Sequence, residues 1–258
     1  MTLGRITVKS NRQIAAGIFE TVFETGSDLS GILPGQFISL YPKNPVLTLP
    51  RPFAVCDTEG SELKIVSMIV GKGTEELSQY SEGGTVKAMF PLGNGFDFEE
   101  AAKHRNHVLV GGSIGAAPLL LLAKTLSGMG CSVSTYLGFK SEALLVDEFK
   151  KYSEKLFVAT DDGSRGEKGT VTELLNRHEP NGDMYYACGP VPMLKALDAY
   201  LRDRGAEGQF SLDERMACGF GACVGCAVKI RKAGSDDWQY LKVCKDGPVF
   251  NYRDIVWE

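Results

Sequence analysis

From His107 onwards the sequence alternates between short apolar runs and longer amphipathic segments, and this alternation constrains the fold most strongly. The run VLVGGS at 108–113 is typical of a buried strand, and a helix is predicted directly after it, over 116–130. The same order continues through CSVSTYLGF, a helix expected over 143–154, KLFVATDD, GTVTELLNRH, DMYYACGP and VPMLKALDAYLRDRG. Short connections between alternating strands and helices predict a parallel sheet that is covered on both faces.

The residues before this region show a different sequence pattern. Between Ile6 and about Phe96, short β-like runs such as QFISLYP, LKIVSMIV and TVKAMF are separated by glycine and proline turns. Such regular short strands favour a small antiparallel β-barrel. We therefore predict a multi-domain β plus α/β chain with an antiparallel barrel at 1–98, a parallel-sheet α/β domain at 99–207 and a small C-terminal domain at 208–258.

Composition and charge argue against several classes of partner. The 258 residues carry a formal net charge of −4, and the charges are interspersed rather than clustered. This distribution disfavours nucleic acid and anionic membranes as partners. The polar N-terminal stretch MTLGRITVKSNRQ lacks the apolar core of a signal peptide, and the apolar run at 116–123 is too short to span a bilayer. We expect a cytoplasmic protein.

Four of the seven cysteines form a ligand pattern near the C-terminus. Cys218, Cys223 and Cys226 are spaced C-x4-C-x2-C, and Cys244 follows after seventeen intervening residues. This is the plant-type [2Fe–2S] pattern, and the glycines between the cysteines allow the loop to wrap tightly around four inward-pointing thiolates. Structural zinc sites usually pair two C-x2-C knuckles, and only one is present. The sequence therefore predicts a [2Fe–2S] cluster held by these four residues, with zinc or free thiols as the alternatives.

Two motifs in the predicted barrel indicate a flavin. Arg51 to Ala54 reads RPFA, which combines a cation for a pyrophosphate with an extended backbone, because proline favours an extended predecessor. Some twenty residues later, VGKGTEELS places Gly73 and Thr74 at the start of a predicted helix, where backbone N–H groups bind phosphate well. The alternative for the second motif is a hairpin turn with an N-cap residue.

Two glycine-containing turns follow predicted strands of the α/β region. The turn GGSIGAAP at 111–118 lies between a strand and a helix, as a pyrophosphate-binding turn requires, although it departs from the G-x-G-x-x-G fingerprint. Because the carboxyl ends of parallel strands meet at one edge, the CGP turn at 188–190 is expected beside it. Glycines needed only for packing, and a Cys188 that is simply buried, are the alternatives. The predicted NAD-binding residues are Gly111, Gly112, Ser113, Gly115, Cys188, Gly189 and Pro190.

With these motifs in this order, the whole chain resembles the ferredoxin-reductase superfamily, and within it the electron-transfer subunits of class 1B dihydroorotate dehydrogenases. The segments that carry the resemblance are RPFAV, VGKGT, GGSIGAAP, YACGP, DERMACGFGACVGCAV and VCKDGPVF. The resemblance implies an oxidoreductase subunit in pyrimidine (UMP) biosynthesis. Electrons from dihydroorotate would pass from a partner FMN-containing catalytic subunit through the [2Fe–2S] cluster and FAD to NAD⁺, in a heterotetramer of two plus two chains.

The resemblance also implies which residues contact the flavin. They are Arg51, Pro52, Phe53, Ala54, Val66, Ser67, Met68, Gly73 and Thr74. Members of the family often carry serine or threonine where this chain has Ala54, so any hydrogen bond to the flavin edge at this position must come from the backbone. The family's cluster ligands correspond to Cys218, Cys223, Cys226 and Cys244.

No residue is predicted to act as a catalytic acid or base on dihydroorotate. The three histidines, at 104, 107 and 178, are isolated in the sequence, which confines the expected role of this chain to electron and hydride transfer. Two other hypotheses stay open at this point. In the first, the chain is an NAD(P)H-dependent flavin and iron–sulfur reductase with a different redox partner. In the second, it is a cluster-bearing sensor that has lost flavin.

Overall fold

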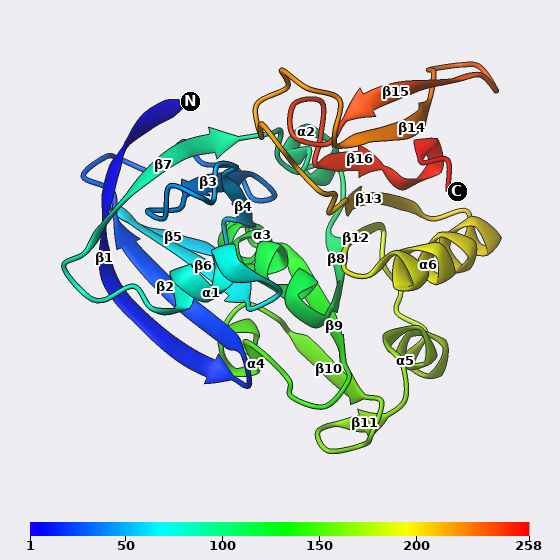
Figure 1. Cartoon of the computed structure of the whole chain (residues 1–258). Coiled ribbons are helices and arrows are strands. Elements are labelled where there is room, and N and C mark those ends of the chain that lie inside the picture. Colours follow the sequence, from blue (N-terminus) through cyan, green and yellow to red (C-terminus); the bar gives the residue numbers. More distant parts are fainter. Residues whose placement is uncertain (258) are drawn as a thin grey trace.

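Seven antiparallel strands in the first part of the chain form a sheet that curls into a half-barrel (Figure 1). The computed structural model describes residues 1–257. Within this sheet the order is β4-β3-β7-β1-β2-β6-β5, so that β4 and β5 lie at its edges. The strands are β1 (Thr2–Ala15), β2 (Ile18–Glu24), β3 (Phe37–Tyr41), β4 (Arg51–Ala54), β5 (Asp57–Glu59), β6 (Glu62–Met68) and β7 (Thr85–Leu92), with α1 (Lys72–Ser78) between β6 and β7.

A second seven-stranded sheet follows, in the order β11-β10-β9-β8-β12-β13-β16. All neighbours in it are parallel except β13 and β16, which pair antiparallel. Its central strands are buried on both faces, which explains their continuous apolar sequences. The strands are β8 (Asn106–Gly112), β9 (Ser132–Phe139), β10 (Lys155–Thr160), β11 (Glu167–Lys168), β12 (Met184–Cys188), β13 (Glu207–Ser211) and β16 (Val249–Asn251).

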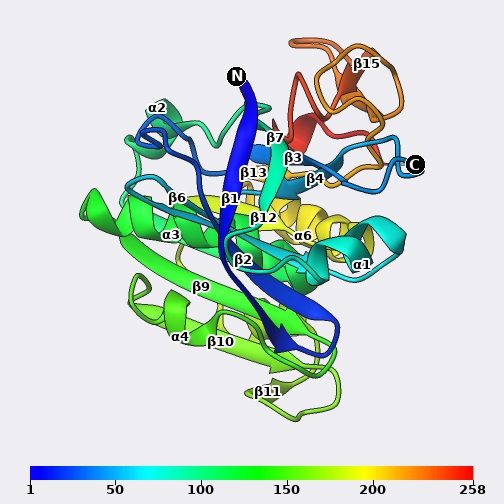
Figure 2. The same cartoon turned by 60° about the vertical axis from the view of Figure 1, so that its left-hand side comes forward.

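Helices cover both faces of this sheet, as the strand–helix alternation predicted. The helix α3 lies between the sheet and the half-barrel: Leu119 and Leu120 pack towards the sheet, whereas Leu121 belongs to the core of the barrel (Figure 2). On the other face, α5 and α6 bury Leu174, Leu197 and neighbouring side chains. The helices are α2 (Phe98–Ala101), α3 (Ala117–Gly128), α4 (Val146–Phe149), α5 (Val171–His178) and α6 (Val191–Arg204), with 3₁₀ turns η1 (Ser113–Ala116) and η2 (Tyr252–Asp254).

The predicted helix over 143–154 is much shorter than expected. Only Val146–Phe149 is helical, because the chain then turns towards the sheet. The backbone N–H of Glu154 already donates to the carbonyl of Val133 in β9, 2.8 Å away, and β10 begins at the next residue. The need to pair with β9 therefore overrides the helical tendency of the segment.

The C-terminal segment leaves the second sheet after β13 and returns to it at β16. Between these strands lie the cysteine loop and a two-stranded hairpin of β14 (Ala227–Arg231) and β15 (Trp238–Lys242) (Figure 1). The fold class is thus confirmed: an antiparallel half-barrel, a mainly parallel sheet with helices, and a small two-stranded C-terminal region. The limits 1–98, 99–207 and 208–258 stay predictions about separate units, since the second sheet takes strands from both later segments.

Contacts between the half-barrel and the second sheet are polar as well as apolar. The Lys124 ammonium on α3 donates to the Asp57 carboxylate at 2.8 Å and to the Thr58 carbonyl at 2.9 Å. The Ala16 amide donates to Glu142 at 2.9 Å. Within residues 1–257, no helix has the length and apolar character needed to cross a membrane.

Candidate cofactor cleft and cysteine loop

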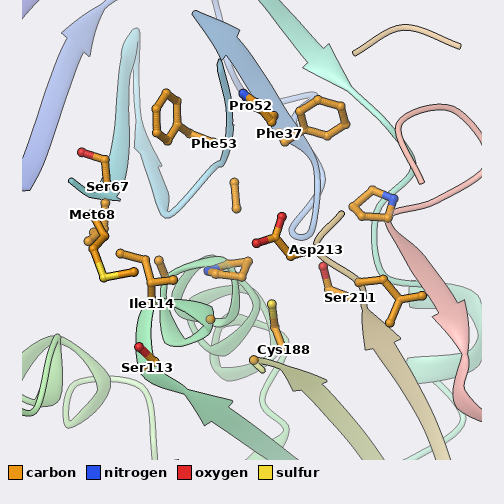
Figure 3. Close-up of a pocket in the computed structure, with 18 of the residues that line it drawn as sticks. Phe37, Pro52, Phe53, Ser67, Met68, Ser113, Ile114, Cys188, Ser211 and Asp213 are labelled. Carbon is orange, nitrogen blue, oxygen red and sulfur yellow. The ribbon is translucent and has the colours of Figure 1, made fainter. Parts of the chain in front are cut away.

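A cleft of about 500 Å³ lies between the half-barrel and the carboxyl ends of the parallel strands (Figure 3). One wall is formed by β4 and the end of β6. The opposite wall is formed by the turns that follow β8 and β12. The structure therefore brings the residues predicted for flavin and for nucleotide into one cavity, as the rule for carboxyl ends of parallel strands requires.

On the barrel side, eight of the nine predicted flavin residues line the cleft. They are Arg51, Pro52, Phe53, Ala54, Val66, Ser67, Met68 and Thr74. The ninth, Gly73, lies directly beneath the Arg51 guanidinium, so that a Cβ at this position would collide with the Arg51 side chain. The guanidinium also donates to the Leu49 carbonyl at 2.6 Å. A fixed cation above a backbone without a side chain is a cradle that fits a pyrophosphate.

The Thr74 hydroxyl is engaged within its own loop. It accepts from the Val70 amide at 2.9 Å and donates to the Gly71 carbonyl at 3.0 Å. This arrangement fixes the turn that precedes α1, with Gly71 as the N-cap residue and Thr74 as the third residue of the helix, and it supports the turn-and-cap alternative for this motif. Val70 and Thr74 also line the cleft, so the same turn forms part of the cavity wall.

On the sheet side, the glycines of the two turns pack against each other. A Cβ on Gly115 would lie 2.5 Å from the Cys188 carbonyl oxygen, and a Cβ on Gly189 would lie 3.1 Å from the Gly112 Cα. Gly111 is shielded from the cleft and faces Leu137 and Ala116. These glycines are therefore needed for packing, as the alternative interpretation of the turns expected. The close approach that they permit also forms this wall of the cavity. Gly112, Ser113, Gly115, Cys188, Gly189 and Pro190 all line it.

Three side chains from neighbouring strand ends meet at the floor of the cleft. Figure 3 shows the Asp213 carboxylate pointing into the cavity, with the Cys188 thiol below it and Ser211 beside it. Burial raises the pKa of the Cys188 thiol to about 12, so this thiol is protonated at neutral pH. Burial also raises the pKa of Asp213, although water in the open cleft still reaches the side chain. A bound ring system would deepen that burial.

Sequence reasoning missed a large part of this cavity. The additional lining residues are Gly35, Phe37, Val70, Ile114, Ala117, Pro118, Val191, Ser211, Leu212, Asp213, Met216 and Pro248. The carboxyl-end rule that located Gly189 would also have located Asp213, had the short polar run EGQFS been read as a parallel strand. Phe37 and Pro248 carried no comparable signal.

The four predicted cluster ligands lie together as two pairs. The Cys218 and Cys223 side chains interact with each other, and so do those of Cys226 and Cys244. In residues 1–257 no three His, Cys, Asp or Glu side chains converge as they would around one metal ion. A two-iron cluster instead takes two cysteines at each iron, which matches the pairing.

Backbone N–H groups surround these sulfurs. The Gly221 amide donates to the Cys244 sulfur at 3.2 Å, and the Cys223 amide to the Cys218 sulfur at 3.4 Å. Burial acts against ionisation of Cys218, but hydrogen bonds from the Cys223, Phe220 and Ala222 backbone lower the pKa of this thiol to about 6. Burial and the neighbouring Cys226 raise the pKa of Cys244 to about 12. A donor set of four thiols with N–H groups directed at the sulfurs fits an iron–sulfur cluster, whose binding displaces the thiol protons.

The cysteine loop lies close to the cleft. Met216 lines the cavity only two residues before Cys218, and burial, with a smaller effect from the neighbouring Cys218, raises the pKa of Tyr41 at the end of β3. On the outer side of the loop, the Phe220 and Val224 side chains are 46% and 74% exposed. The loop therefore contacts the cavity on one side and presents apolar groups to solvent on the other.

The histidines are distant from these sites. His107 is buried, and its ring lies 3.2 Å from the Tyr186 hydroxyl. His178 stacks on Phe157 and contacts Glu167. Neither ring lines the cleft.

Together, the half-barrel, the cleft and the cysteine loop define an FAD- and NAD-binding reductase fold with an added iron–sulfur-binding region. Residues 213–256 match the family model described as the iron–sulfur cluster binding domain of dihydroorotate dehydrogenase B. A solved structure of an NADH-dependent reduced ferredoxin-NADP oxidoreductase superposes with a TM-score of 0.84 and 30% identity, covering 98% of this chain and 90% of that one.

Full-length relatives narrow the assignment. The dihydroorotate dehydrogenase B (NAD(+)) electron transfer subunit of Caldanaerobacter subterraneus subsp. tengcongensis is 40% identical over 249 residues, 96% of each chain. The subunit of the same name from Lysinibacillus sphaericus is 38% identical over 251 residues, 95% of each chain. The chain belongs to the family of electron transfer subunits of NAD-dependent dihydroorotate dehydrogenase B.

Proposed function

We propose that this chain carries electrons between a [2Fe–2S] cluster at Cys218, Cys223, Cys226 and Cys244 and NAD⁺ by way of one FAD in the cleft. The observation that supports it best is the shared cavity: β4, the β8 turn, the β12 turn and Met216 all face the same space. When bound, the flavin exchanges two electrons with the nicotinamide as a hydride, and the cluster exchanges electrons singly.

Each wall of the cleft has a separate task in this proposal. Arg51 and the backbone at Gly73 hold the FAD pyrophosphate, while β4 and the end of β6 orient the ring. The turns after β8 and β12 bind the nicotinamide nucleotide, with the Cys188 thiol held neutral beneath it. The residues assigned to FAD are Arg51, Pro52, Phe53, Ala54, Val66, Ser67, Met68, Gly73 and Thr74, and those assigned to NAD are Gly112, Ser113, Gly115, Cys188, Gly189 and Pro190. Gly111, which is shielded from the cleft, supports the turn through its packing on Leu137 and Ala116 instead of binding NAD.

Oxidation of dihydroorotate takes place on the FMN-containing partner in this proposal, in the synthesis of UMP in the cytoplasm. Among residues 1–257 no histidine lines the cleft, and the one acid that does, Asp213, follows β13. We further propose a heterotetramer of two such chains and two catalytic subunits. The resemblance supports the stoichiometry, and the exposed Phe220 and Val224 beside the cysteines support docking through this loop.

The proposal is tested with the purified chain, its Cys223→Ser variant and the catalytic subunit. NADH is expected to reduce the flavin of both forms, because the cysteine loop is separate from the flavin wall. Dihydroorotate is expected to reduce the flavin only when the catalytic subunit is present and Cys223 is intact. Iron and acid-labile sulfide are expected to fall in the variant while FAD stays bound.

Three results would contradict the proposal. Dihydroorotate turnover by the chain alone would refute the division of labour. Full iron and sulfide content in Cys223→Ser would refute the cluster assignment. Efficient reduction of ferredoxin but not of the catalytic subunit would favour a reductase with a different partner.

A further inference from the structure

Ser39 in β3 is a buried hydroxyl without a partner. Its side chain is 1% exposed, and in the described part of the chain its oxygen has no hydrogen-bond partner. Buried polar groups in folded proteins are almost always hydrogen-bonded, so an orphaned hydroxyl indicates a missing ligand or a functional role. The residue lies in the middle of β3, opposite Pro52 of β4 and Met89 of β7, where neither neighbouring strand supplies an acceptor.

The hydroxyl faces the cysteine loop. Its oxygen lies 2.8 Å from the point at which a Cβ would stand on Gly219, the residue directly after Cys218. Gly219 is buried and has a φ of 77°, so it combines a left-handed backbone with an approach that no side chain permits. The loop is therefore pressed against β3 at Ser39, whose buried O–H has no partner.

Alternate residues of β3 connect the two cofactor regions. Phe37, Ser39 and Tyr41 share one face of the strand, since side chains alternate along it. Phe37 lines the cleft, Ser39 meets Gly219, and Tyr41 packs against the core cluster that includes Cys226 and Cys244. Along β3, Ser39 thus lies between the cleft residue Phe37 and Tyr41, and it contacts the cysteine loop at the buried Gly219.

We propose that Ser39 donates a hydrogen bond to a sulfur of the bound cluster, either the Cys218 thiolate or a bridging sulfide, and so sets its reduction potential from the flavin side. A hydroxyl that has no carbonyl or carboxylate acceptor can be satisfied by an anionic sulfur in this position. Donors to cluster sulfurs stabilise the more negative, reduced form, and therefore raise the potential. The donors described above are backbone amides. Ser39 would add a side-chain donor, which a substitution can remove without changing the backbone of the loop.

This inference rests on the proposed function, because it requires a cluster in the loop. The test is a redox titration of the loaded protein, followed by electron paramagnetic resonance, for wild type, Ser39→Ala and Ser39→Thr. Ser39→Ala is expected to lower the equilibrium constant for cluster reduction by about three- to tenfold, up to about 59 mV for a one-electron couple. Ser39→Thr keeps the hydroxyl and is expected to restore most of the potential.

Two controls separate this effect from a general disturbance. Thr21 in β2 is equally buried, but its hydroxyl already donates to Asn11 at 2.9 Å, so Thr21→Val should leave the cluster potential unchanged. The flavin potential, measured in the same titration, should not move in Ser39→Ala. Loss of iron in Ser39→Ala but not in Ser39→Thr would likewise support the contact.

The inference is overturned if Ser39→Ala holds a full cluster at the wild-type potential, or if Ser39→Thr shifts the potential as far as Ser39→Ala does. Wild-type protein that binds no iron or sulfide would overturn the proposed function together with this inference. Unchanged potentials in protein that binds a cluster would overturn the inference alone.

Discussion

Within the described residues 1–257, Arg51 is the only cation that lines the cleft, and it lies against the backbone of Gly73. Because charge-assisted hydrogen bonds contribute about 1.5–3 kcal/mol, Arg51→Ala should weaken FAD binding roughly ten- to a hundredfold. The dissociation constant is measured by titrating flavin into stripped protein. Arg51→Lys keeps the charge but loses the planar guanidinium, so its affinity for FAD should lie between those of wild type and Arg51→Ala. An equal affinity in wild type and Arg51→Ala would show that Arg51 serves another purpose.

Ionisation of the Asp213 carboxyl should lower the free energy of unfolding, and this effect depends on pH. Burial raises the pKa of this carboxyl in the folded chain above its value in the unfolded chain, so the folded state binds the proton more tightly. Stability therefore falls as pH rises through the window between the two pKa values, and the full penalty applies above it. Asp213→Asn should raise the melting temperature at neutral pH.

The advantage of Asp213→Asn should shrink as the pH is lowered towards the acidic limit at which the protein remains folded. Thermal unfolding at a series of pH values checks this trend. A gain in melting temperature that is the same at every pH would mean that the carboxylate charge is not responsible. A loss at neutral pH would show that the ionised carboxylate makes a favourable contact in the loaded cleft.

At the scale of elements, the contact between the β8 and β12 turns depends on Gly115. A methyl group there would lie 2.5 Å from a backbone carbonyl, which cannot move away as a flexible side chain could. Gly115→Ala should therefore destabilise the fold by about 1–3 kcal/mol and weaken binding of NADH more than binding of FAD. Gly128, at the end of the same helical segment, faces open space, and Gly128→Ala is the matched control.

Equilibrium unfolding and titration with NADH measure the two effects. Gly128→Ala should be neutral or slightly stabilising, since alanine has the higher helix propensity. Gly115→Ala protein with wild-type stability and NADH affinity would show that the turns can separate without consequence.

Elements with a strong local signal were predictable, and those fixed by distant partners were not. The strand–helix alternation predicted β8, α3, β12 and α6. Strands buried on both faces of a parallel sheet have continuous apolar sequences, which separates them from the helices that follow. The shortening of α4 follows from pairing with β9, and β16 is a strand only because β13 lies beside it. Neither partner is near in sequence.

The same distinction applies to the site. Arg51, the glycine turns and the cysteine spacing are local patterns with a chemical meaning. The positions of Ser39 against Gly219 and of Asp213 in the cleft result from packing between segments far apart in the chain. A single sequence contains no period or spacing that reports such contacts.

At the scale of the whole molecule, Phe220 is the exposed aromatic side chain of the cysteine loop. Placing a charge there should weaken assembly with the catalytic subunit about tenfold or more, because aromatic side chains in the centre of an interface carry much of its binding energy. Phe220→Asp should retain the absorption of both cofactors. Sedimentation or titration calorimetry of the complex measures the change.

Met129→Asp is the control for this surface. Met129 is 47% exposed, like Phe220, but it follows the far end of α3, about 18 Å along the helix from the cleft. Its substitution should leave assembly unaffected. If Phe220→Asp assembles as well as Met129→Asp, the partner docks elsewhere.

The antiparallel pairing of β13 with β16 has a consequence for the connectivity of the fold. Ser211 and Val249 are direct neighbours in the sheet, so the cysteine loop and its hairpin leave and re-enter the fold at adjacent points. Joining two antiparallel strands at such points takes only a short turn. The connectivity of the two large sheets therefore does not depend on residues 212–248, and this segment joins the rest of the fold through packing instead, with Val243 and Cys244 in the core and Asp213 and Met216 in the cleft.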